Sequence, residues 1–221
     1  MPAIANVALD PRKTLTYRFF ARLIAILSAF WFSPKVEGAE NIPLEGAVII
    51  APIHRSNIDF ALSLFISDRK IFFMAKDGLF KFKPLGWLLL RLGAFPVKRG
   101  TADREAMALA EAVLTQGQAL LMFPEGTRFV GRSVLPLRDG AMFIAARAQA
   151  KVVPVGIAGS DEAMGEGDKF IHRAKIRVVV GAAIDPPAAN GRVSRTAISQ
   201  KSEELREKLE AVYHQSLERL N

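Results

Sequence analysis

Residues 47–60 read AVIIAPIHRSNIDF and join an apolar run directly to a polar cluster. The run 47–52 is short, rich in Val and Ile and free of charge, which is typical of a strand buried on both faces of a sheet. His54 follows the run, and Asp59 comes five positions later. Since α/β proteins place their sites where strands end and helices begin, this stretch predicts an α/β fold with a site at its polar end.

The rest of the chain alternates between strand-like and helix-like runs. Four more apolar runs have the length of strands: 71–75, 119–123, 152–157 and 176–180. Apolar residues at helical spacing mark 101–115, 139–150 and 194–220. The Gly-rich and acidic stretch 159–167 is expected to be a surface loop. Strands separated by helices predict an α/β fold with a mixed, largely parallel sheet covered by helices.

An apolar run near the start, 23–32, follows the basic residues Arg18 and Arg22. These ten residues reach only about 15 Å as a helix, half of the roughly 30 Å hydrocarbon core of a membrane, and cannot cross it. Extended back to Leu15, the segment predicts an amphipathic, membrane-associating helix, while packing against the core explains the pattern equally well. We expect it to be retained, since no small-residue cleavage site follows.

The length of 221 residues is closest to one sizeable domain. We therefore divide the chain into an N-terminal membrane-associating helix, 1–34, and one α/β domain, 35–221. The chain has no Cys. That lack excludes disulfide scaffolds, thiolate metal sites and cysteine nucleophiles.

Lys and Arg number 30 against 22 Asp and Glu, which gives a net charge of +8. Most of the excess lies between Asp68 and Glu105, where nine basic residues accompany four acidic ones. Long-range attraction favours an anionic partner, and nucleic acid, anionic lipid and phosphorylated metabolites all remain open. A solvated basic face that keeps the protein soluble is the simpler alternative.

His54 and Asp59 are the residue types of a general base and its orienting carboxylate. A neutral imidazole takes a proton from a hydroxyl, and a carboxylate on the other ring nitrogen fixes the tautomer and stabilises the imidazolium. The two side chains can meet if Asp59 lies in the first turn of a helix capped by Ser56 or Asn57. A structural histidine beside an aspartate is the alternative that the pair alone leaves open.

A second cluster, FPEGTR at 123–128, follows another predicted strand. Gly126 permits close approach of a ligand, and Arg128 offers a planar fork for phosphate. Glu125 either orients a substrate hydroxyl or holds an arginine. A tight turn with a salt bridge is the structural alternative.

A third cluster, GAFPVKRG at 93–100, places Lys98 and Arg99 after an apolar stretch. An edge strand with exposed charges explains it equally well. The remaining histidines, His172 and His214, lack comparable surroundings and are expected at the surface. The sequence also shows no clustered His and carboxylate set that argues for a metal site.

Together these clusters resemble, in order and wording, the glycerolipid acyltransferase family of the lysophosphatidic acid acyltransferase type. The family's His-x-x-x-x-Asp box matches His54 to Asp59, and its Phe-Pro-Glu-Gly-Thr-Arg block matches 123–128 letter for letter. Its second block matches 93–99, and a Val-Pro-Val-Gly strand matches 153–156. The family often has Asn before the box, where this chain has Ile53, a difference we interpret as subfamily variation.

The resemblance implies an enzyme that moves a fatty acyl group from a thioester to the free hydroxyl of lysophosphatidic acid, which gives phosphatidic acid. His54 is then the general base and Asp59 orients it, in a direct transfer without a covalent enzyme intermediate. The resemblance assigns substrate binding to Lys98, Arg99, Glu125, Gly126, Thr127 and Arg128. Arg99 and Arg128 are expected to hold the acceptor phosphate, with Lys98 a weaker candidate.

By the same resemblance the donor is acyl-CoA or acyl carrier protein, and no cofactor or metal is expected. We expect peripheral or monotopic attachment to the anionic cytoplasmic face of the membrane, and no nucleic acid partner. Glycerol 3-phosphate, another lysophospholipid or a glycolipid is the alternative acceptor. A non-catalytic basic module that binds membrane or nucleic acid is a different class of answer, and it leaves the clusters at His54 and Glu125 unexplained.

Overall fold

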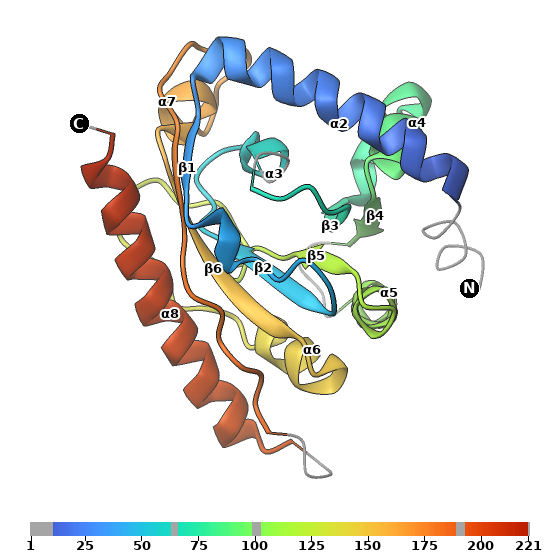
Figure 1. Cartoon of the computed structure of the whole chain (residues 1–221), viewed down its shortest axis with the longest axis vertical. Coiled ribbons are helices and arrows are strands. Elements are labelled where there is room, and N and C mark those ends of the chain that lie inside the picture. Colours follow the sequence, from blue (N-terminus) through green and yellow to red (C-terminus); the bar gives the residue numbers. More distant parts are fainter. Residues whose placement is uncertain (1–10, 63–65, 99–102, 189–192, 221) are drawn as a thin grey trace.

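The computed structural model describes residues 11–62, 66–98, 103–188 and 193–220, with side chains from residue 15 onward. They form a seven-stranded sheet flanked by helices (Figure 1). The strand order is β1-β7-β6-β2-β5-β3-β4, and every neighbouring pair is parallel except β6 with β7. The α/β fold with a mixed, largely parallel sheet is therefore confirmed.

Strands and helices lie close to the ranges that the sequence predicts. The strands are β1 (Lys35–Glu37), β2 (Val48–Pro52), β3 (Ile71–Lys76), β4 (Ala94–Val97), β5 (Ala119–Leu121), β6 (Lys151–Ala158) and β7 (Arg177–Val180). The α-helices are α2 (Pro11–Phe32), α3 (Asp59–Leu62), α4 (Lys83–Arg91), α5 (Arg104–Thr115), α6 (Gly140–Ala148), α7 (Ser160–Met164) and α8 (Arg195–Glu218). Two short 3-10 helices are η1 (Ala39–Asn41) and η3 (Asp77–Lys81).

The central strand β2 supplies both hydrophobic cores, because successive side chains of a strand point to opposite faces. Ile50 belongs to the core that also includes residues of α2, α3 and α4, and Ile49 belongs to the core formed with α5 and α6. The long helix α8 runs beside β6 (Figure 1) and joins both cores, with Leu209 in the first and Leu205 in the second. The sheet is thus covered on both faces.

Five strands point the same way, namely β2 to β6, so their carboxyl ends share one edge of the sheet. The loops that leave this edge carry His54 after β2, Lys98 after β4 and Phe123 after β5. Three sequence clusters separated along the chain therefore meet at one edge, as expected for parallel strands.

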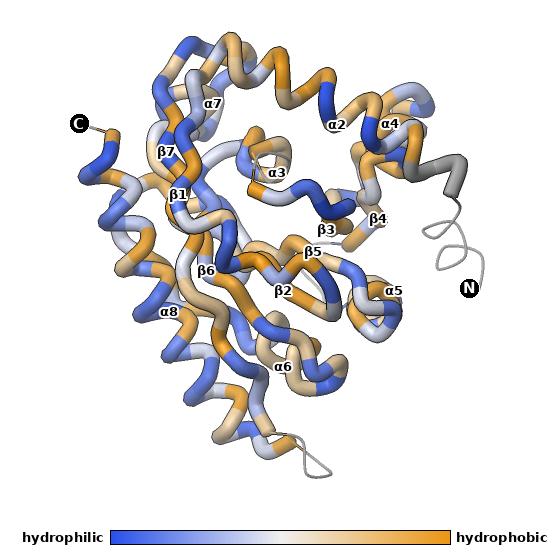
Figure 2. The backbone as a smooth tube through the Cα atoms, viewed as in Figure 1, coloured by the Kyte–Doolittle hydropathy of each residue, from blue (hydrophilic) through white to orange (hydrophobic). Residues whose placement is uncertain are grey.

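Helix α2 extends further than the ten-residue apolar run that the sequence analysis considered. It has 22 residues, and Leu15–Phe32 is long and apolar enough to cross a membrane by length and composition alone. The limit of about 15 Å holds for residues 23–32 alone and does not apply to the whole helix. Figure 2 shows that α2 is largely apolar, in contrast to the mostly hydrophilic α8.

One side of α2 packs on the protein and the other is exposed. Phe20 contacts Trp87 of α4 edge to face, with ring centroids 5.9 Å apart, and Tyr17 and Phe32 are buried. The opposite side exposes large apolar residues: Leu15, Phe19, Leu23, Ile26, Leu27, Phe30 and Trp31. Packing against the core is thus confirmed for one side of the segment, while association of its apolar outer face with a membrane stays a prediction.

Two further expectations need correction. The stretch 159–167 is not all loop, because Ser160–Met164 forms helix α7, in which Ser160 and Ala163 are buried. Arg69, counted within the basic excess, does not face a ligand; its guanidinium donates hydrogen bonds to the carbonyls of Pro43, Gly46 and Gly117. Part of the basic excess is therefore structural.

Candidate active site

The His54 and Asp59 side chains meet directly. His54 Nδ1 lies 2.9 Å from Asp59 Oδ2, and both side chains are buried. A carboxylate at this distance accepts the Nδ1 proton, which leaves the Nε2 lone pair free to accept a proton from a substrate. The pair therefore has the geometry of a base with an orienting acid.

Asp59 also shapes the loop that carries His54. Its Oδ2 atom accepts the backbone N–H groups of Arg55 at 2.8 Å and Ser56 at 2.7 Å. Ser56 Oγ in turn accepts the N–H of Ile58, close to the capping role expected for it. One carboxylate oxygen of Asp59 therefore contacts both the His54 ring and the backbone of the two residues that follow it, which orients the imidazole.

His54 lines a pocket of about 250 Å³ at the carboxyl edge of the sheet. Its ring stacks on Phe123, with centroids 3.8 Å apart and planes 17° apart. The remaining wall is formed by these described residues: Met74, Val97, Lys98, Met107, Leu121, Met122, Pro124, Gly126, Arg138, Gly140 and Ala141. The pocket is mostly apolar, and its lining includes two basic residues, Lys98 and Arg138, besides His54.

Glu125 lies beneath the pocket rather than in it. Its carboxylate accepts the backbone N–H groups of His54 and Leu135, each at 3.0 Å, and lies 2.9 Å from the Arg55 guanidinium. The Glu125 and Arg55 side chains are 0% and 1% exposed. Of the two roles foreseen for Glu125, holding an arginine is the one that its contacts display.

Arg55, which the sequence analysis passed over, ties the His54 loop to the segment after β5. Besides Glu125, it donates to the carbonyls of Gly131 at 3.0 Å and Ser133 at 2.7 Å. Its guanidinium also lies 5.2 Å from the ring centroid of Tyr213 in α8. Burial raises the pKa of the Tyr213 hydroxyl, and the Arg55 charge opposes that shift. The motif loops and the C-terminal helix thus form one unit.

The predicted substrate-binding residues are not all brought to the pocket. Lys98 and Gly126 line it, whereas Thr127 is exposed and its hydroxyl donates to the Arg128 carbonyl. Arg128 is half-buried and does not line the pocket in the described part of the chain. Arg99 lies outside the described residues. Arg138 lines the pocket although no sequence argument selected it.

Lys98 is held by the helix that follows it. Its backbone N–H donates to Asp103 Oδ2 at 2.8 Å, while Asp103 Oδ1 accepts from Ala106 and caps α5. These backbone hydrogen bonds lower the pKa of the Asp103 carboxyl. Asp103 therefore joins the end of β4 to α5 and fixes the backbone at Lys98.

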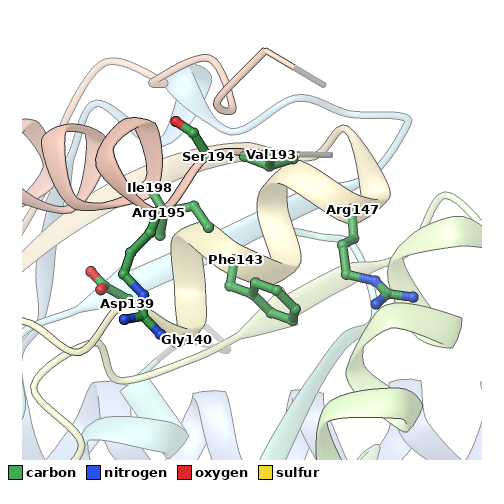
Figure 3. Close-up of a pocket in the computed structure, with 8 residues that line it drawn as sticks. All are labelled: Asp139, Gly140, Phe143, Arg147, Val193, Ser194, Arg195 and Ile198. Carbon is green, nitrogen blue, oxygen red and sulfur yellow. The ribbon is translucent and has the colours of Figure 1, made fainter. Parts of the chain in front are cut away.

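A larger groove of about 1020 Å³ adjoins the His54 pocket and shares Gly140 with it. Figure 3 shows this groove between α6 and the start of α8. Phe143 and Arg147 line it from α6, and Arg195 lines it from α8. Arg147 is paired with Glu111 at 2.9 Å. The groove thus extends from the first turn of α6 along the outer side of that helix.

No group of three or more His, Asp or Glu side chains that could hold a metal ion occurs within the described ranges. Apart from the buried pairs His54–Asp59 and Arg55–Glu125, the salt bridges found there lie at partly or fully exposed positions. The polar chemistry of the described interior is therefore concentrated around His54.

Comparisons with known proteins agree on one family. A family model described as Acyltransferase matches residues 33–158. A 1-acyl-sn-glycerol-3-phosphate acyltransferase of Bacillus subtilis is 28% identical over 202 residues, which cover 88% of this chain and 98% of that protein. The chloroplastic LPAT1 of Arabidopsis thaliana is 27% identical over 176 residues, covering 77% of this chain and 49% of that protein. The chain thus spans about half the length of the plant relative.

A solved structure shares the fold. The crystal structure of PlsC from Thermotoga maritima, a 1-acyl-sn-glycerophosphate acyltransferase, matches with a TM-score of 0.69 and 26% identity. The match covers 93% of this chain and 78% of that chain. The region matched by the family model runs from the end of α2 through β6 and includes His54, Asp59 and Glu125.

Proposed function

The chain belongs to the acyltransferase family, and from this we propose that it transfers a fatty acyl group from a thioester to the free hydroxyl of lysophosphatidic acid, giving phosphatidic acid. The observation that carries the proposal is the buried pair of His54 and Asp59 at 2.9 Å, facing a pocket with two cations. Relatives named for this reaction support the choice of acceptor.

In the proposed mechanism His54 Nε2 takes the proton of the acceptor hydroxyl as its oxygen attacks the thioester carbonyl carbon. A C–O bond forms and the C–S bond breaks. The proton held by His54 then passes to the departing thiolate, and Asp59 stabilises the imidazolium between the two steps. The transfer is direct, so neither a cofactor nor a nucleophilic side chain takes part. Base catalysis of this kind contributes about 10²- to 10⁴-fold.

The acceptor phosphate is proposed to lie among the cations of the sequence blocks. Lys98 lines the pocket, and Arg99 follows it directly in the chain. Arg128 leaves the turn at Gly126, where the backbone φ of +71° lets the chain reverse beside the pocket. The contacts of Glu125 support a positioning role beneath this subsite rather than contact with substrate.

The acyl donor is proposed to be a thioester of CoA or acyl carrier protein. The groove next to the His54 pocket supports this part, since it shares Gly140 with the pocket and offers Phe143, Arg147 and Arg195. Its volume of about 1020 Å³ suits a long carrier, whereas the smaller pocket suits a head group. We place the carrier in the groove and the acceptor in the pocket.

We propose that residues 1–34 associate with the membrane and that 35–221 form the catalytic domain, attached to the cytoplasmic face. The exposed apolar side of α2 supports contact with lipid. A second apolar pair, Phe170 and Ile171, is exposed in the segment that precedes β7, and Ile176 of that segment donates its N–H to the Phe32 carbonyl at the end of α2. The net charge of +8 favours an anionic leaflet.

The test is acyl transfer to lysophosphatidic acid in phosphatidylglycerol vesicles, with palmitoyl-CoA or palmitoyl-acyl carrier protein as donor and glycerol 3-phosphate as a parallel acceptor. The His54→Ala variant should lose at least about 100-fold in kcat while it still binds vesicles. The matched control is His172→Ala, an exposed histidine outside the pocket, which should keep full activity. Equal rates for wild type and His54→Ala, or folded protein inactive with both donors, would refute the proposal.

A further inference from the structure

Arg138 precedes α6 and is not among the substrate-binding residues predicted from the sequence. The structure places it in the wall of the pocket that contains His54, together with Lys98. Its backbone is fixed, since its N–H donates to the Pro124 carbonyl at 2.9 Å. Arginine is favoured where planar anions are bound, so an arginine in the lining of the same pocket as the candidate base indicates an anion there.

The Arg138 side chain lies directly over Gly126. A Cβ atom added at position 126 would come within 2.5 Å of Arg138 Nε and 2.6 Å of its Cδ. Only glycine therefore leaves room for the arginine in this position. The glycine of the FPEGTR block thus has a spatial reason here, which is the passage of Arg138 to the pocket.

Arg138 has no anionic partner among the residues that the structure describes. No salt bridge or side-chain hydrogen bond is formed by its guanidinium there, in contrast to Arg55, which is paired with buried Glu125. The described wall of the pocket also contains no Asp or Glu, and its charged groups are Lys98 and Arg138. Lys98 has the Asp103 carboxylate nearby, whereas Arg138 has no such partner. An unpaired guanidinium beside an apolar wall, with a lysine in the same pocket, forms a site for a small anion.

The size and position of the pocket indicate which anion. Its volume of about 250 Å³ lies below the roughly 300–1,000 Å³ of sites for drug-sized ligands, so it suits a head group rather than a nucleotide carrier. In a lysophosphatidic acid the reacting hydroxyl and the phosphate are joined only by the glycerol unit. A cation in the wall of the pocket that contains His54 is therefore placed to hold this phosphate, and Arg138 is such a cation beside Lys98 of the sequence blocks.

We propose that Arg138, assisted by Lys98, binds the phosphate of the acceptor and makes the enzyme specific for a phosphorylated acceptor. This inference rests on the proposed acyl transfer and adds to the phosphate site a residue outside the sequence blocks. Arg138 acts by holding the acceptor. Its loss therefore weakens binding of the acceptor and leaves the proton transfer by His54 unchanged.

The kinetic test compares Arg138→Gln and Arg138→Lys with the matched control Arg132→Gln. Arg132 belongs to the same loop and is exposed, as Arg138 is, but it does not line the pocket. For Arg138→Gln, kcat/KM for lysophosphatidic acid should fall about 10- to 100-fold, equivalent to about 1.4–2.8 kcal/mol. The KM for palmitoyl-CoA and the rate with uncharged monoacylglycerol should stay unchanged. Arg138→Lys should recover part of the loss, because it keeps the charge.

A binding measurement separates this inference from the proposed reaction. Calorimetric titration with glycerol 3-phosphate should show binding to wild type and Arg132→Gln, and at least tenfold weaker binding to Arg138→Gln, whether or not the protein turns over. Gly126→Ala should weaken it similarly, since its Cβ displaces Arg138. Arg138→Gln kinetics equal to those of Arg132→Gln, or a rise confined to the KM for palmitoyl-CoA, would overturn the assignment.

Discussion

The buried ion pair of Arg55 and Glu125 predicts a large and strongly coupled loss of stability on mutation. The two groups are 2.9 Å apart, with side chains 1% and 0% exposed. Removing one partner of such a pair leaves the other charge buried, which costs about 3–5 kcal/mol. Glu125→Gln should therefore remove a large part of the free energy of unfolding, which is typically about 5–15 kcal/mol.

The loss of stability can be measured by thermal unfolding and by urea unfolding. For a domain of about 150–250 residues, 1 kcal/mol shifts Tm by about 2–4 °C, so Glu125→Gln should lower Tm by about 6–20 °C. Arg55→Met should act similarly. The double variant should lose less than the sum of the two single variants, by up to about 3 kcal/mol, because no charge is then left unpaired. Circular dichroism during urea unfolding measures all three.

An exposed pair on α8 provides the matched control. Arg206 and Glu210 lie 3.1 Å apart with side chains 29% and 38% exposed, and breaking such a pair should cost less than about 1 kcal/mol. If the Arg55 and Glu125 variants were additive to within about 0.5 kcal/mol, the two residues would not act as a pair and the reasoning would fail. A cost at Glu125 no larger than that of the α8 pair would refute it equally.

Three further predictions concern other parts of the fold. Gly156→Ala should cost about 1–3 kcal/mol in urea unfolding, since its Cβ would overlap the backbone of α8. Gly78→Ala should be nearly neutral, because a Cβ there would meet only Lys76 Cε at 3.8 Å, and similar losses for both variants would contradict this packing. The lowered pKa of Asp103 means that its charged form stabilises the fold above its unfolded pKa of about 3.9 and that this is lost as the pH falls through the lower folded pKa. The stability advantage of wild type over Asp103→Asn should therefore shrink below about pH 4, and an advantage constant from pH 7 to pH 3 would count against it. Replacing the exposed Ile26 and Phe30 by Ser should weaken binding to phosphatidylglycerol vesicles at least about tenfold in sedimentation while Tm is unchanged, and undiminished binding would exclude α2 as the contact.

The sheet is predictable from sequence because its signals are local. The strands β2, β3, β5, β6 and β7 lie within or overlap apolar runs of five or six residues, and the helices α5, α6 and α8 carry clear apolar spacing or caps. The strand β1 and the helix α7 are not predictable in this way. They contain 3 and 5 residues, too few for a period to show, and they form because the surrounding fold provides partners.

In the site, too, contacts between residues close in sequence are predictable and contacts between distant residues are not. His54 and Asp59 are five positions apart, so a turn followed by a helix is enough to bring them together. The pairing of Arg55 with Glu125 spans 70 positions and depends on β2 and β5 lying side by side. Arg138 lines the pocket because the segment before α6 folds back on the FPEGTR block, where its N–H donates to the Pro124 carbonyl, and no spacing in the sequence reveals this contact.

The pairing of β1 with β7 has a consequence for synthesis on the ribosome. Residues 35–37 find their hydrogen-bonding partners only when residues 177–179 have been translated, and the cation–π contact of Arg55 waits for Tyr213. Helix α2, by contrast, is translated before all of them and consists of one continuous segment. The nascent chain therefore displays an apolar helix long before it can assemble the loop around His54, and contact with a bilayer during translation would come before the enzyme can fold.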